Sequence, residues 1–173
     1  FCVGLCMRFH QYKQKEKYSF QPFSITKAFH KLHKARLEGN RTLGKILGDA
    51  ITRSIQTLIA IGGFIILFSV LTEIMHEINF AQLVSGLISI ILAWFQLPAE
   101  MALPFFSGLF ELTIGANEIS KTSSETLIQV IFVSVILAFN GFSVQAQVAS
   151  ILAETDIRFL PYFIARLIHC LFA

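Results

Sequence analysis

Residues 98–118 read PAEMALPFFSGLFELTIGANE, and this stretch decides the fold of the chain. It is too apolar for a loop in water. Two prolines, two glycines and three glutamates nevertheless divide it into pieces too short for a plain membrane span. Broken helices at membrane depth are tolerated only where their backbone is buried in protein or lines a cavity. The stretch therefore predicts a re-entrant helical segment over residues 98–122.

Long apolar segments flank this stretch on both sides. We expect them at about residues 54–78, 81–97, 126–142 and 157–173. The connector between the first two is short, so these two are expected to form an antiparallel pair. The whole chain of 173 residues is 54% hydrophobic and only 14% charged, whereas soluble domains carry about 25% charged residues. We predict an all-α membrane protein with about four transmembrane helices and interrupted or re-entrant helical hairpins.

Charge is distributed unevenly along the chain. Residues 1–53 hold eleven basic and three acidic residues (+8), and the remainder holds three and eight (−5), which together give the net charge of +3. The positive-inside rule makes residues 10–53 a basic cytoplasmic loop between residues 1–9, interpreted as the end of a truncated transmembrane helix, and a membrane domain over 54–173. Within the loop, residues 24–47 form either an amphipathic interfacial helix or a solvated segment. The flanking spans explain the basic bias without nucleic-acid binding.

A second interruption lies at Asn140-Gly141, because Asn-Gly is a strong turn signal inside an otherwise apolar stretch. Hydrogen-bonding side chains follow it at Ser143, Gln145 and Gln147. Their spacing of two suits an extended stretch, whereas on a helix they would fan around it. Two interrupted segments rich in such groups point to the binding site of a transporter. The alternative is that these groups bond neighbouring helices and serve packing.

Two ionisable residues stand out within apolar surroundings, Glu111 and Arg166. An ionised group at membrane depth costs at least ~2.5 kcal/mol on insertion scales, so it usually has a partner or a function. Glu111 is interpreted as a proton carrier, a cation ligand or a substrate acceptor, unless it lies at a helix end near the interface. Arg166 either pairs with Glu111, meets an anionic solute, or extends to the interface.

The sequence holds no catalytic motif, since a GxSxG elbow, a Walker loop, GxGxxG and HExxH are all absent. The ExxH spacing of Glu73 and His76 stands alone at the end of a span, so we interpret these two residues as interfacial rather than as metal ligands. No enzyme activity, metal site or cofactor is expected. The coupling ion, H⁺ or Na⁺, is left open.

Residues 108–115, GLFELTIG, and 139–148, FNGFSVQAQV, together resemble the YlbJ family of sporulation integral membrane proteins, which carry the nucleoside-recognition, or gate, domain. Residues 165–169, ARLIH, look like the end of that family. The resemblance extends from about residue 42 onward. It implies that the chain is the C-terminal half of a longer multi-pass protein of the bacterial cell membrane or outer forespore membrane, with residues 54–173 as a gate-like domain.

The resemblance further implies transport of dipicolinic acid, a small anionic solute, across the outer forespore membrane during sporulation. The implied partners are the lipid bilayer, this solute and the N-terminal half of the same protein, without nucleic acid. The alternative function is a non-transporting membrane scaffold that recruits partners through its basic loop. With Arg166 added from its position, the predicted substrate-binding residues are Glu111, Thr113, Asn140, Ser143, Gln145, Gln147 and Arg166.

Overall fold

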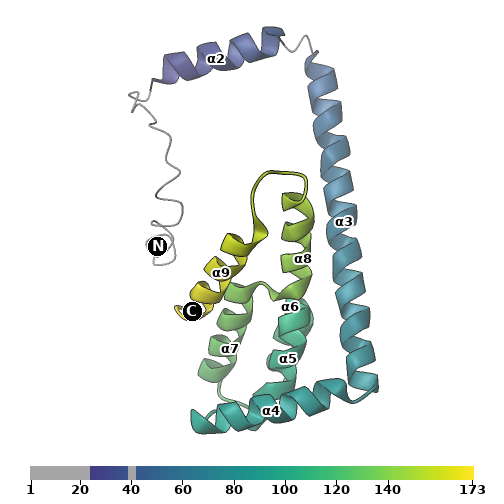
Figure 1. Ribbon diagram of the computed structural model, residues 1–173, viewed down its shortest axis with the longest axis vertical. Coiled ribbons are helices and arrows are strands. Elements are labelled where there is room, and N and C mark those ends of the chain that lie inside the picture. The colour runs from purple at the N-terminus through teal and green to yellow at the C-terminus, as the bar shows by residue number, and fades with distance from the viewer. Residues whose placement is uncertain (1–23, 39–41) are drawn as a thin grey trace. The chain divides into compact units, whose positions relative to one another are not determined.

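The computed structural model describes residues 24–38 and 42–173, and within these ranges the chain is helical and contains no strand (Figure 1). The predicted span end over residues 1–9, and residues 10–23 of the loop, lie outside the described residues. The described chain divides into two compact units, one up to Ile59 and one from Ala60 onward. The elements are α2 (Ile25–Glu38), α3 (Leu43–Glu77), α4 (Phe80–Trp94), η2 (Ala99–Met101), α5 (Ala102–Phe110), α6 (Leu112–Ile119), α7 (Thr126–Phe139), α8 (Gly141–Leu152) and α9 (Phe159–Cys170).

Helix α3 begins at Leu43, eleven residues before the predicted start of the first apolar segment at residue 54. The assignment of residues 10–53 to a basic cytoplasmic loop stays a prediction. Thr42 precedes α3 as a capping residue, with Oγ1 accepting a hydrogen bond from the Lys45 amide at 3.4 Å. Residues 43–77 contain no proline to stop a helix. Among the described residues, Gly44–Glu77 and Thr126–Leu152 are long and apolar enough to cross a membrane.

Helix α4 does not run back along α3, contrary to the predicted antiparallel pair. Asn79, in the left-handed region at φ 61°, ends the turn after α3, a conformation that asparagine tolerates better than most residues. Helix α4 then crosses the beginning of α5 (Figure 1). It packs there because Leu92 joins a buried apolar cluster completed by Met101, Ala102, Ile119, Phe132 and Ile136.

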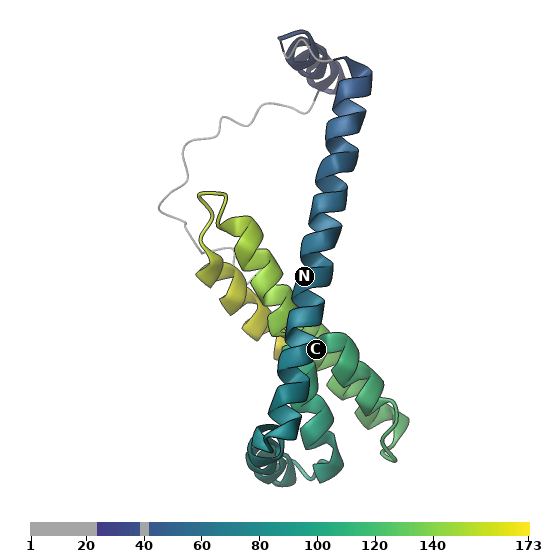
Figure 2. The same ribbon diagram turned by 90° about the vertical axis from the view of Figure 1, so that its right-hand side faces the viewer.

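The interrupted segments are helical on both sides of each break. Helices α5 and α6 lie within the predicted segment 98–122 and fold back on each other around Glu111, whereas α7 and α8 follow one another across Asn140 (Figures 1 and 2). Ser143, Gln145 and Gln147 lie on α8, so of the two conformations that their spacing left open the helical one is present. At the second break Asn140 and Gly141 have positive φ, and the chain resumes its helix at once. Re-entry of the α5–α6 hairpin into a membrane stays a prediction.

The end of α3 is joined to the hairpin by a hydrogen bond that the sequence did not indicate. His76 Nε2 lies 3.0 Å from Oγ of Ser107, a fully buried residue of α5 that also donates to the Leu103 carbonyl at 3.3 Å. The serine hydroxyl can therefore accept from the histidine N–H. His76, interpreted from sequence as interfacial, in fact positions α5.

We expect Ser107→Ala to lower the stability of the protein by about 1 kcal/mol, because it removes the acceptor of the His76 N–H. Thermal unfolding of the purified full-length protein measures this change, and adding His76→Ala should cost less in the Ser107→Ala background than in the wild type. The matched control is Ser89→Ala, since Ser89 bonds only the Gly86 carbonyl of its own helix. Equal losses from Ser107→Ala and Ser89→Ala would show that the contact contributes nothing.

Candidate functional site

The tip of the α5–α6 hairpin is a single extended residue, Glu111, with φ −136° and ψ 113°. Its side chain is only 1% exposed. One carboxylate oxygen, Oε2, accepts hydrogen bonds from the Thr113 amide at 2.8 Å and the Ile114 amide at 3.0 Å, and from the Thr113 hydroxyl. The Glu111 side chain therefore acts as the N-cap of α6.

The capping bonds affect the charge of the Glu111 carboxylate. The N–H groups that begin α6 carry partial positive charge, and a carboxylate placed there is stabilised by them. The negative charge of Glu111 is thus partly neutralised inside the protein without a cationic side chain. Because the three bonds fall on Oε2, the other oxygen of the carboxylate takes no part in the cap.

The break between α7 and α8 lies directly against this tip. Asn140 and Gly141 both have positive φ, at 75° and 65°. A Cβ on Gly141 would lie 3.2 Å from the Gly108 carbonyl oxygen, 3.5 Å from that of Phe110 and 3.4 Å from the Leu112 amide nitrogen. The two interruptions, about thirty residues apart in sequence, therefore meet backbone to backbone.

Arg166 reaches the same break from α9. Its Nε donates to the Tyr162 hydroxyl at 3.2 Å, and its guanidinium lies 5.4 Å from the centre of the Tyr162 ring. The Asn140 amide is satisfied at both ends when its oxygen accepts from Arg166 Nη2 at 2.8 Å and its nitrogen donates to the Leu137 carbonyl at 2.7 Å. Arg166 is bonded here to neutral groups, and Glu111 to α6, so the structure does not support the suggested pairing of these two residues.

The polar side chains of α8 differ in their hydrogen-bond partners. Gln145, 3% exposed, donates through Nε2 to the Phe139 carbonyl at 2.7 Å, a group that the helix break leaves without its usual partner. Its Oε1 is the buried side-chain polar atom for which the described part of the chain provides no partner. Gln147 donates to the fully buried Ser143 hydroxyl at 3.4 Å. These contacts tie the break together and leave one strong acceptor available.

Aromatic rings surround the meeting point of the two breaks. We call Phe106, Phe110, Phe142, Phe139 and Phe163 the aromatic chain, because successive ring centres lie 5.0, 5.3, 5.3 and 6.2 Å apart. It links α5 through the break to α9. Electrostatic interactions are stronger in such apolar surroundings than in water.

The structure thus brings Glu111, Thr113 and Asn140 to one region, with Arg166 bonded to Asn140 and Gln145 to the neighbouring Phe139 carbonyl. Their role in binding a solute stays a prediction. Sequence reasoning missed Tyr162, although its i,i+4 spacing to Arg166 is a usable signal on a helix. It also missed His76 and Ser107, which no local pattern connects.

Comparison with known proteins places these features in context. The family model for nucleoside recognition (Gate) matches residues 58–157, which include both interruptions. The sporulation integral membrane protein YlbJ of Bacillus subtilis (strain 168) is 49% identical over 177 residues, covering 99% of this chain and 43% of that protein. The chain thus spans less than half the length of this relative. No solved structure matches it.

Proposed function

Because the chain belongs to the nucleoside-recognition (Gate) family of integral membrane proteins, we propose that it forms part of a transporter for a small anionic solute, and that the solute binds where the two helix breaks meet. The observation that carries this proposal is the backbone contact of Gly141 with the hairpin tip. A protein that only anchors partners in a membrane has no need to interrupt two helices and bury both interruptions together.

The charges at the meeting point favour an anion. The Arg166 guanidinium is bonded to the neutral Tyr162 and Asn140 side chains, and a guanidinium has five N–H donors in a planar fork that suits a carboxylate. The Glu111 carboxylate is bonded to the N–H groups that begin α6 and not to Arg166, so it leaves the guanidinium donors to other acceptors. The aromatic chain offers ring faces to a planar solute.

We further propose dipicolinate as the solute, a planar aromatic dianion whose two carboxylates would match a cationic site among aromatic side chains. The name of the relative links that protein to sporulation, the setting in which this solute accumulates according to the family resemblance. Coupling to H⁺ or Na⁺ is left open by this proposal.

Uptake of dipicolinate into liposomes containing the full-length protein tests the proposal. Transport requires uptake that exceeds that of protein-free liposomes. The alternative, a scaffold that recruits partners through the basic loop, requires no uptake, together with loss of the sporulation phenotype when residues 10–50 are deleted.

Arg166→Gln is expected to reduce the initial uptake rate by about tenfold or more, since a hydrogen bond to a charged group contributes about 1.5–3 kcal/mol. Arg166→Lys should be intermediate, because lysine keeps the charge but loses the fork and the stacking on Tyr162. Arg158→Gln is the matched control, since Arg158 is exposed before α9 and lies away from the break. If Arg166→Gln transports like Arg158→Gln, Arg166 does not bind the solute.

A further inference from the structure

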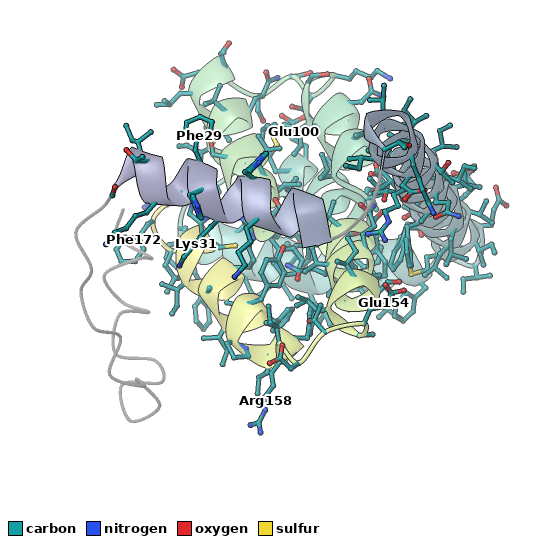
Figure 3. The ribbon with its side chains drawn as sticks, turned by 90° about the horizontal axis from the view of Figure 1, so that it is seen from above. Phe29, Lys31, Glu100, Glu154, Arg158 and Phe172 are labelled. Atoms are coloured by element: carbon teal, nitrogen blue, oxygen red, sulfur yellow. The ribbon has the colours of Figure 1, made fainter. Side chains whose placement is uncertain are left out.

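Helix α2 has two chemically different sides. Ser24 caps it, accepting a hydrogen bond from the Lys27 amide at 3.4 Å, and the helix then runs from Ile25 to Glu38. Helical periodicity places Ile25 and Phe29 on one side and Lys27, Lys31 and Lys34 on the other. Figure 3 shows Phe29 and Lys31 projecting from opposite sides of the helix.

The apolar side of α2 is exposed at Ile25 and Phe29 in the described part of the chain. Ile25 is 62% exposed and Phe29 is 70% exposed. The helix carries four basic residues and one acidic residue, a net charge of +3 with its histidines neutral. A helix with exposed apolar residues on one side and lysines on the other fits the surface of an anionic membrane, where each basic residue contributes about 1 kcal/mol.

The length of α3 determines the depth at which α2 meets the membrane. Its 35 residues span about 52 Å at 1.5 Å per residue. A bilayer with its headgroups is roughly 40–45 Å thick. A tilt of about 30°, within the range seen for membrane helices, therefore places Leu43 at the headgroups on the basic side of the membrane. Helix α2 ends only a few residues before Leu43, so the chain itself holds α2 near the lipid.

We propose that α2 lies in the surface of an anionic lipid leaflet, with Ile25 and Phe29 inserted at the boundary between headgroups and acyl chains and with its lysines facing the lipid phosphates. The basic loop is then a lipid-binding element rather than a solvated connection. This surface is independent of the solute site, so either proposal can fail without the other.

Fluorescence of the full-length protein in lipid nanodiscs tests this placement. The native cysteines are replaced by serine, and one environment-sensitive nitrobenzoxadiazole label is attached at Phe29→Cys, at Ile25→Cys or, as the matched control on the opposite side, at Lys31→Cys. Quenching by aqueous iodide is measured in phosphatidylcholine nanodiscs with and without phosphatidylglycerol, at low and high salt.

We expect the labels at positions 25 and 29 to be shielded from iodide in the anionic nanodiscs, and to become accessible in phosphatidylcholine alone or at high salt. The label at position 31 should stay accessible throughout. Adding Lys27→Gln to the Phe29→Cys protein should weaken the bound state about fivefold. Equal accessibility at positions 29 and 31 in both lipids overturns the proposal. Shielding from iodide that does not change with lipid charge or salt also overturns the proposal, because it would mean that α2 packs on protein.

Discussion

Gly115→Ala is expected to disrupt the α5–α6 hairpin and with it both the stability and any transport activity of the protein. A Cβ at this position would lie 2.2 Å from the Gly108 Cα, 2.4 Å from the Gly108 nitrogen and 2.9 Å from the Pro104 carbonyl oxygen. All three are backbone atoms, which cannot rotate away as a side chain can. The two helices would have to move apart, at a cost of about 3 kcal/mol or more, the upper range for overpacked sites.

Gly86→Ala is the matched control for this substitution. Gly86 also lies inside a helix, but an added Cβ there meets nothing within 4 Å. Both substitutions raise helix propensity by up to about 1 kcal/mol, so the difference between them isolates the contact with Gly108. Thermal unfolding of the full-length protein measures the difference. If both variants melt alike, the close approach of α5 and α6 at these glycines does not exist in the folded protein.

Glu111→Ala is expected to destabilise the protein by about 2–4 kcal/mol. The change removes the cap of α6 and leaves the Thr113 and Ile114 amides without their acceptor, where a cap alone contributes about 1–2 kcal/mol and a buried unsatisfied donor costs about 1–3 kcal/mol. Glu111→Gln should fold much better, because its amide oxygen still accepts from these N–H groups. Unfolding temperatures of the two variants test this order.

Glu111→Gln then separates the structural role of the residue from a chemical one. If the carboxyl carries a proton during transport, this variant should lose accumulation of dipicolinate against a gradient and still exchange solute across the liposome membrane. Glu118→Gln, in the same helix but outside the cap, is the control and should accumulate normally. Wild-type accumulation in Glu111→Gln would leave capping of α6 as the whole role of the residue.

The class of fold and the positions of the breaks were predictable from sequence because they depend on local chemistry. Proline and glycine density marked the hairpin, Asn-Gly marked the second break, and the all-α class and the family were both confirmed. The start of α3 was not predictable from hydropathy, because a capped helix can continue through polar residues beyond the apolar span. The spacing of Ser143, Gln145 and Gln147 could not decide between an extended and a helical conformation, because side chains two apart occur in both.

The contacts between breaks could not be derived from one sequence. Gly108 and Gly115 meet because they are placed almost evenly on either side of Glu111, a relation that appears only once the chain turns there. Asn140 and Arg166 are joined by the packing of α9, which brings together residues 26 positions apart. These contacts are tertiary, and neither the hydrophobic periodicity nor the residue types of any one segment predict them.

The aromatic chain has a consequence for the electrical insulation of the membrane. A break in a helix exposes polar backbone groups, which attract water into a bilayer that otherwise excludes it. If both breaks lie within the bilayer, as proposed, the polar backbone groups at their meeting point would attract water, through which protons or ions could leak and dissipate a gradient. Rings packed edge to face from Phe110 through Phe142 and Phe139 to Phe163 present a hydrocarbon barrier around that meeting point. On the proposed placement of the breaks within the bilayer, the side chains that would offer ring faces to a planar solute would also hinder leakage of ions.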